Sequence, residues 1–350
     1  MTRAWLIIAG LGLALGCAVD PRDADFATSG GGSSSVTAEG TSGAAGDAAT
    51  TNAMGDTADA ADDSDGDAMG GPKLDVGAPD PDAPSAAEHC TAVDLLFVID
   101  NSPSMGQYQE QLAFAFPTFI DEVWATLPPD TDLHVGITTT SFFDGSCSES
   151  TMNCATAQTP AEVDAHYMTP SQGSTGVNGE QGRLFSYDAL PYFEATVGGD
   201  PWPLKIWFAE AAVAAGETGC SYEMSAAGGA YAVAPDNDAT NAGFVRDAGA
   251  VLAIFFLTDE PDKSPEGAQA YVDMIAAAKT ECGGLDCVIA AGLVNECIMG
   301  VDNTLWQVIT GLTANPVIGS IDDPAGYAGV IGGALAEVIG QTCDEIPPEG

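Results

Sequence analysis

Apolar and polar positions follow two different patterns beyond the first quarter of the chain. Short, nearly continuous runs of aliphatic and β-branched residues are typical of strands buried on both faces of a parallel sheet. Strands are predicted at residues 93–99, 133–140, 250–257, 287–294 and 316–321. Apolar residues at helical spacing predict helices at about residues 108–127, 203–215, 222–233, 265–280, 305–312 and 327–342. This alternation predicts an α/β fold with a mostly parallel, doubly wound sheet flanked by helices.

The same pattern divides the chain into a linker and one large domain. Residues 17–88 are a low-complexity stretch of Gly, Ser, Ala, Thr and Asp. They contain too little apolar surface to offset the entropy cost of folding. We therefore expect a disordered acidic tether, followed by a folded domain over residues 89–350. Residues 141–200 interrupt the alternation of strands and helices, so we interpret them as an insertion in that domain.

The amino terminus has the features of an export signal. Arg3 precedes an apolar run at residues 4–16, which is too short to span a bilayer but suits a signal peptide covering residues 1–16. The sequence Leu-Ala-Leu-Gly-Cys at residues 13–17 resembles the lipobox of bacterial lipoproteins, although Leu is preferred where Ala14 stands. The resemblance implies a lipid anchor on Cys17 and, since no Asp follows it, an outer-membrane or cell-surface location. The alternative is an ordinary cleavage site with an incidental Cys.

The charge balance excludes whole classes of partner. Lys and Arg number 8 against 51 Asp and Glu, which gives a formal net charge of -43 at pH 7. Such a chain repels a phosphate backbone, so nucleic acid is excluded, and the expected contact with a membrane is through the lipid anchor. The excess of acids has two interpretations, namely a highly charged secreted protein or the binding of divalent cations.

The cysteines support an oxidising compartment. Of the 9 cysteines, eight remain when Cys17 is set aside, and an even number in an exported chain predicts up to four disulfides. The pairs we expect are Cys90–Cys343, Cys147–Cys154, Cys220–Cys297 and Cys282–Cys287. Other pairings stay open, because spacing alone does not determine connectivity. The lack of a C-x-x-C pair argues against a structural zinc site.

Acidic and hydroxyl side chains follow two of the predicted strands. Residues 100–104 read Asp-Asn-Ser-Pro-Ser, and a second strand ends in Thr-Asp-Glu at residues 258–260. Because ligands bind at the carboxyl ends of strands in such sheets, we expect the two segments to form one site. Carboxylate and hydroxyl oxygens are suitable ligands for a small divalent cation such as Mg²⁺. The alternative for Asp100, Ser102 and Ser104 is a helix N-cap.

Together these segments resemble the von Willebrand factor A domain and its metal-ion-dependent adhesion site. The resemblance covers about residues 91–343 and is most specific at residues 93–105, which read VDLLFVIDNSPSM. It implies that Ser102 and Ser104 coordinate Mg²⁺, or Mn²⁺ or Ca²⁺, directly. It also implies that Asp100 and Asp259 bind the cation directly or through water.

A third ligand is less well defined by the resemblance. Family members supply a Thr from a loop between two helices, which corresponds here to residues 216–223. This loop has no T-x-T pattern, so Thr218 and Ser221 are both candidates, and residues 138–140 are a third. We expect Asp262 to be a solvated loop acid rather than a supporting group of the site, and His134 to be structural or exposed.

The motifs of common enzymes are missing from the sequence. It contains no G-x-S-x-G, no H-E-x-x-H, no phosphate-binding loop and no G-x-G-x-x-G after a strand, so we expect a protein that is not an enzyme. The resemblance implies a binding module in which an Asp or Glu of a protein partner completes the coordination of the cation. The expected function is a surface-tethered lipoprotein for protein binding or adhesion. The alternatives are a structural envelope lipoprotein with a stabilising metal and a metal-assisted hydrolase.

Overall fold

The structure is a computed structural model that describes residues 91–142, 163, 166–170, 178–300, 302–314, 316–329 and 332. The predicted signal peptide, the lipid anchor on Cys17 and the tether over residues 17–88 lie outside these residues. So do four of the cysteines: Cys90, Cys147, Cys154 and Cys343. In the part of the chain that the structure describes, no helix combines the length and the apolar character needed to span a membrane.

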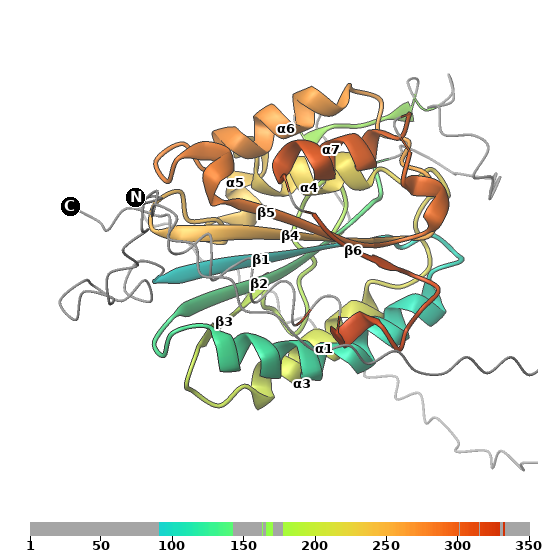
Figure 1. The fold of residues 1–350 in the computed structure, drawn as a ribbon. Helices are drawn as coiled ribbons and strands as arrows, with labels where there is room; N and C mark the ends of the chain where they lie inside the picture. The colour runs from blue at the N-terminus through green and yellow to red at the C-terminus, as the bar shows by residue number, and fades with distance from the viewer. Residues whose placement is uncertain are drawn as a thin grey trace, which may run out of the picture. The chain divides into compact units, whose positions relative to one another are not determined.

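A six-stranded sheet, in the order β3-β2-β1-β4-β5-β6, forms the centre of the fold (Figure 1). Its strands are β1 (Ala92–Ile99), β2 (Asp132–Thr139), β3 (Tyr192–Thr196), β4 (Ala250–Thr258), β5 (Val288–Val294) and β6 (Val317–Ser320). All neighbouring pairs are parallel except β2 and β3, which are antiparallel. The predicted α/β class with a mostly parallel sheet is therefore confirmed.

Helices cover both faces of the sheet (Figure 1). The helices are α1 (Gly106–Thr126), α3 (Trp202–Ala214), α4 (Ser225–Val233), α5 (Asp238–Asn241), α6 (Ala268–Ala277) and α7 (Thr304–Leu312). Short 3-10 turns occupy Pro235–Asn237, Gly284–Cys287 and Glu296–Ile298. Helices α1 and α3 lie on one face, and α4, α5, α6 and α7 lie on the other. This layered arrangement leaves the ends of the strands accessible for a site.

The core consists of two apolar layers separated by the sheet. Successive side chains of a strand point to opposite faces, so Leu95 and Phe97 of β1 pack in the layer under α1 and α3, while Leu96 and Val98 pack under α4, α6 and α7. Phe97 stacks on Phe255 of β4 with 4.9 Å between ring centroids. Every residue of β1, β4 and β5 is buried, which explains why these strands appear in the sequence as continuous apolar runs.

Three features differ from the sequence predictions. Strand β3 lies inside the segment interpreted as an insertion, where its partly exposed residues lack the apolar signal of the central strands. The helix predicted at residues 222–233 begins three residues later, at Ser225. The helix predicted at residues 265–280 is shorter and spans Ala268–Ala277. The last predicted helix starts at Tyr327, but most of it lies outside the described residues.

A buried ion pair holds the amino-terminal edge of the sheet. Asp94 of β1 has no exposed surface, and it accepts hydrogen bonds from the backbone nitrogen and Nε of Arg246, both at 2.8 Å. The Nδ1 of His134 lies 2.8 Å from the Phe244 carbonyl oxygen and 3.6 Å from Asp94. His134 is therefore a buried structural residue, which confirms one of its two expected roles.

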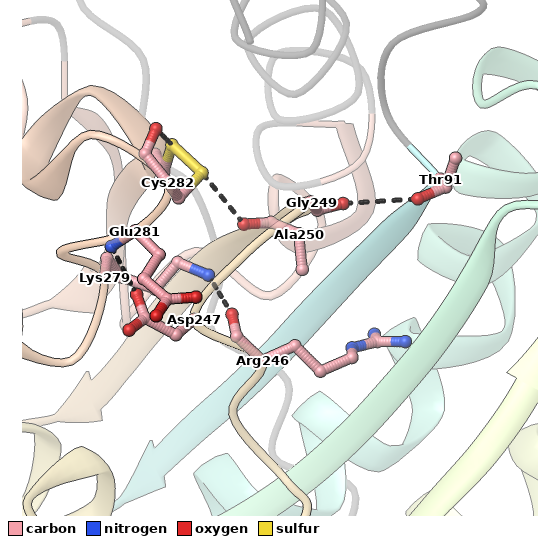
Figure 2. Close-up of a disulfide and its surroundings, with 9 residues drawn as sticks. Thr91, Arg246, Asp247, Gly249, Ala250, Lys279, Glu281 and Cys282 are labelled. Carbon is pink, nitrogen blue, oxygen red and sulfur yellow. Dashed lines mark hydrogen bonds between the residues drawn. A yellow bond between two sulfur atoms is a disulfide. The ribbon is translucent and has the colours of Figure 1, made fainter. Parts of the chain in front are cut away.

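The segment before β4 is attached to the chain that follows α6 (Figure 2). The ammonium group of buried Lys279 donates a hydrogen bond to the Arg246 carbonyl oxygen, and the backbone nitrogen of Glu281 donates one to Asp247 at 2.8 Å. Cys282 forms a disulfide with Cys287, which is one of the four pairs expected from the sequence.

Two further cysteines of the described residues, Cys220 and Cys297, are also disulfide-bonded. Both lie near the carboxyl-terminal edge of the sheet, Cys220 in the loop between α3 and α4 and Cys297 in the 3-10 turn after β5. Disulfides are thus present near both edges of the fold, as expected for an exported chain.

Candidate metal centre

The register of the two central strands brings Asp100 and Asp259 to one edge of the sheet. Strands β1 and β4 are parallel, with Ile99 paired to Leu257. The backbone nitrogen of Asp100 donates a hydrogen bond to the Leu257 carbonyl oxygen at 2.9 Å. Asp100 follows β1 directly and Asp259 follows β4, so both carboxylates lie at the carboxyl-terminal edge, where ligands bind in such folds.

Three donors hold the carboxylate of Asp100 in place. The backbone nitrogen of Ser102 donates to Oδ1 at 2.8 Å, and the hydroxyl of Thr258 donates to Oδ2 at 2.8 Å. A longer hydrogen bond of 3.4 Å comes from the hydroxyl of Thr140, at the end of β2. Three neighbouring strands therefore contribute to the position of this one buried side chain.

The two serines connect the two carboxylates. The hydroxyl oxygens of Ser102 and Ser104 are 3.2 Å apart, and the hydroxyl of Ser104 donates to Asp259 Oδ1 at 3.2 Å. Ser102 is buried, whereas Ser104 is half-buried. The structure thus brings together all four of the residues Asp100, Ser102, Ser104 and Asp259, which we call the serine–aspartate group.

Burial dominates the electrostatics of this group. Burial raises the pKa of Asp100 to about 7, and the negative charge of Asp259 adds to the rise, while hydrogen bonds from Ser102 and Thr258 partly offset it. Burial also raises the pKa of Asp259. Burial and mutual repulsion disfavour the ionised form of two neighbouring carboxylates, whereas a nearby positive charge stabilises it.

The helix-cap alternative does not agree with the structure. The residue at the N-cap position of α1 is Met105, and no side chain caps the helix. The first turn of α1 is instead attached to the site through Gln109, whose Nε2 donates to the carbonyl oxygens of Asp100 at 3.0 Å and of Gly216 at 2.8 Å. Asp100, Ser102 and Ser104 are therefore available for another role.

The loop between α3 and α4 packs directly on the Asp100–Ser104 loop at Asn101. The backbone nitrogen of Gly219 donates to the Asn101 carbonyl oxygen at 2.8 Å. A Cβ atom on Gly219 would lie only 2.3 Å from Asn101 Oδ1, so no larger residue fits without displacing the loop. The glycine thus allows the two loops to approach closely.

The two hydroxyl candidates of this loop do not reach Asp100. Thr218 is exposed and Ser221 is half-buried, and within the described residues neither forms a hydrogen bond with the serine–aspartate group. Of the three candidates, only residues 138–140 form a hydrogen bond with the serine–aspartate group. The hydroxyl of Thr140 donates it to Asp100. The loop between α3 and α4 supplies a different side chain.

That side chain is Glu223, which the sequence analysis missed. Glu223 has no exposed surface, and no hydrogen-bond donor among the described residues reaches either of its carboxylate oxygens. Burial raises its pKa well above the ordinary value, and the charges of Asp100, Glu260 and Asp259 raise it further. The available signal was an acid two residues before a short apolar helix of small residues, but the sequence pattern does not reveal that this acid is buried.

The prediction for Asp262 is wrong, because this side chain is buried rather than solvated. Its Oδ1 accepts hydrogen bonds from the backbone nitrogen of Ala226 at 3.0 Å and from the hydroxyl of Ser264 at 3.0 Å. Asp262 therefore satisfies a free nitrogen in the first turn of α4. Burial raises its pKa to about 6.

The chemistry of the serine–aspartate group fits a hard divalent cation. In the described ranges, no three His, Cys, Asp or Glu side chains form a group that could hold a metal ion. The serine–aspartate group is of another kind, since it combines two carboxylates with two hydroxyls. Mg²⁺, Mn²⁺ and Ca²⁺ prefer such oxygen ligands.

Comparisons with known proteins give distant structural similarities. No protein-family model matches the chain, and no curated protein matches its sequence. The structure is similar to a von Willebrand factor type A protein from Catenulispora acidiphila, with 16% identity, a TM-score of 0.34 and coverage of 72% of this chain and 43% of the other. Proximal thread matrix protein 1 from the mussel byssus is also similar in structure. It has 11% identity and a TM-score of 0.37, and the similarity covers 73% of this chain and 49% of the other.

A pilus adhesin, SpaC from Lactobacillus rhamnosus GG, is also similar in structure. It shares 13% identity with a TM-score of 0.38, and the similarity covers 72% of this chain and 30% of the adhesin. The chain spans less than half the length of each of these three proteins.

Proposed function

We propose that the chain is a surface-tethered lipoprotein whose folded domain binds a protein partner, or mediates adhesion, in a metal-dependent manner. One observation supports this proposal above all, the hydrogen-bonded serine–aspartate group at the carboxyl-terminal edge of the sheet. The proposed role of the group is binding rather than catalysis.

In this proposal, Ser102, Ser104, Asp100 and Asp259 hold Mg²⁺, or Mn²⁺ or Ca²⁺. The bound cation supplies positive charge and a coordination position that an Asp or Glu of the partner completes. Thr258 and Thr140 orient the carboxylate of Asp100 through their hydroxyl groups. Asp100 is therefore held in position before the cation binds. Ser104 is the more exposed of the two serines, so in this proposal it is the ligand nearest the partner.

The charge of the chain explains why such binding would depend on the cation. At a formal net charge of -43, the chain repels an acidic partner at long range. A cation at the edge of the sheet reverses the sign of the potential locally, so an acidic side chain is favoured at that point alone. The cation would therefore provide both affinity and specificity.

Titration calorimetry with Mg²⁺ and Mn²⁺ tests this proposal, together with capture of proteins from envelope extracts in Mg²⁺ or EDTA. We expect Asp100→Asn and Asp259→Asn to lose cation binding and metal-dependent capture while remaining folded. Asp286→Asn is the matched control, because Asp286 is an exposed acid near the opposite edge of the sheet. Unchanged cation binding in both site variants would contradict the proposal. Cation binding without metal-dependent capture would support a purely structural metal.

A further inference from the structure

Glu223 is a buried carboxylate without a hydrogen-bond donor. Its exposed fraction is 0%, and within the described residues neither Oε1 nor Oε2 has a partner. A buried carboxylate in this situation is unfavourable unless a proton or a cation compensates it. The serine–aspartate group does not account for Glu223, since the hydrogen bonds within that group involve other residues.

Glu260 lies next to Glu223 at the carboxyl-terminal edge of the sheet. Burial and the neighbouring charge of Asp259 raise the pKa of Glu260, and the charge of Glu260 in turn raises the pKa of Glu223. Glu260 belongs to the loop that follows β4, and this loop contacts Glu223 through the backbone nitrogen of Lys263. Glu260 is 4% exposed, so water provides little compensation for either acid.

The backbone holds this acidic pair against the serine–aspartate group. The backbone nitrogen of Lys263 donates to the carbonyl oxygen of Glu223 at 2.6 Å, and that of Met224 donates to the Thr140 carbonyl oxygen at 3.2 Å. Glu260 directly follows Asp259 in the chain. The two pairs of acids therefore belong to one rigid edge of the sheet, and neither pair can move away without breaking backbone hydrogen bonds.

A charge count shows that one cation does not compensate this edge. Asp100, Asp259, Glu223, Glu260 and Asp262 carry five negative charges when ionised, and the nearly buried Lys263 contributes one positive charge. One divalent cation therefore leaves a net negative edge, which repels an acidic partner. A second divalent cation neutralises the edge.

We propose that Glu223 and Glu260 hold a second divalent cation beside the cation of the serine–aspartate group. Two carboxylates provide up to four oxygen ligands, an arrangement that suits Ca²⁺ or Mn²⁺. The hydroxyl of Ser225 is a candidate for a further ligand, since it is buried without a partner two residues after Glu223. This inference rests on the proposed function and adds to it a reason why the edge does not repel an acidic partner.

Counting bound Mn²⁺ by electron paramagnetic resonance, on the full chain at physiological salt, tests the inference. We expect the unmodified chain to bind two Mn²⁺ tightly, and Glu223→Gln or Glu260→Gln to bind one. Glutamine preserves the size of the side chain and removes its charge, so neither variant opens a cavity. Asp262→Asn is the matched control, because Asp262 is a buried acid of the same region whose oxygens already have donors. It should retain both cations.

Thermal melts separate a cation site from a pair of carboxyl groups that shares a proton. Both interpretations predict that Glu223→Gln raises the melting temperature in EDTA, because a buried charge is removed. Only a cation site predicts that the increase in melting temperature on adding Mn²⁺ becomes smaller in this variant. An unchanged increase would overturn the inference.

The outcomes also distinguish this inference from the proposed function. Binding of a single Mn²⁺ that is lost in Asp259→Asn and retained in Glu223→Gln would overturn the second site and leave the proposed function intact. Mn²⁺ binding that is unaffected by Asp259→Asn but reduced by Glu223→Gln would contradict the proposed function and support the second site.

Discussion

Asp100 combines complete burial with three hydrogen-bond donors, so its ionisation affects stability and, under the proposed function, would affect metal binding. Hydrogen bonds from neutral donors do not replace the water that burial removes, so the pKa of Asp100 rises from 3.8 to about 7. The folded, metal-free chain therefore holds this proton more tightly than the unfolded chain does. A cation must displace the proton in order to bind.

The sign of this shift predicts how stability depends on pH. In EDTA, the stabilisation from the protonated Asp100 is fully present below pH 3.8 and is lost as the pH rises to about 7. We expect Asp100→Asn to reduce this loss, although the raised pKa values of Glu223, Asp259 and Asp262 act in the same direction. Urea titrations between pH 4.5 and 8 measure the effect. The same pH dependence in both proteins would show that Asp100 does not titrate as we infer.

Gly219 is a second residue whose role depends on its immediate surroundings. Replacing it with Ala places a Cβ atom against Asn101, and such overpacking typically costs about 1–3 kcal/mol. We expect Gly219→Ala to reduce both stability and Mg²⁺ affinity, because Asn101 lies within the Asp100–Ser104 loop. Gly267→Ala is the matched control, since nothing lies within 4 Å of its added Cβ atom. Calorimetry and thermal melts compare the two variants, and equal effects would contradict this role for Gly219.

At the scale of the secondary structure elements, the ion pair between Asp94 and Arg246 connects β1 to the segment before β4. The carboxylate of Asp94 is fully buried, while the side chain of Arg246 is 22% exposed. Arg246 also donates to Asp132 at the start of β2 at 2.9 Å. One side chain therefore connects three segments at the edge opposite the candidate metal centre.

We expect Arg246→Met to destabilise the fold by about 3–5 kcal/mol, because it leaves a buried carboxylate without its main partner. Combining it with Asp94→Leu removes that carboxylate and should restore much of the loss. Chemical denaturation of the single and double variants measures both effects. Equal destabilisation in the two variants would indicate that Arg246 acts through packing rather than through its charge. Mg²⁺ binding should persist in both variants, because the metal centre lies at the other edge.

At the scale of the whole molecule, the proposed function needs the folded domain to be attached to a membrane. The resemblance to a lipobox at residues 13–17 assigns the attachment to Cys17, and the acidic linker over residues 17–88 would hold the domain away from the bilayer. These residues lie outside those that the structure describes, so the attachment remains a proposal.

We predict that the mature chain begins at a lipid-modified Cys17 and partitions with membranes. Cys17→Ser should leave a soluble or unprocessed chain, because it lacks the thiol that carries the lipid. Mass spectrometry of the amino terminus and membrane fractionation decide between these forms. An unmodified amino terminus at another residue would remove the anchor from the proposal.

The sequence alone determined the α/β class and most of the central elements. Strands β1, β4 and β5 were predictable because burial on both faces requires continuous apolar runs, which a sequence displays directly. The same reasoning located Asp100, Ser102, Ser104 and Asp259, since residues that follow parallel strands meet at one edge of the sheet. The partly exposed β3 was missed, because an edge strand needs no such apolar run.

Only the tertiary structure decided which other acids belong to this edge. Asp262 was expected to be solvated and Glu223 was not singled out, yet both are fully buried. Thr218, Ser221 and residues 138–140 were all candidates from the sequence, and the structure shows that Thr140 is the one whose hydroxyl reaches Asp100. The physical reason is that the burial of a loop side chain depends on what packs over it. Those neighbours come from segments far apart in the chain, and no local pattern of residues records their approach.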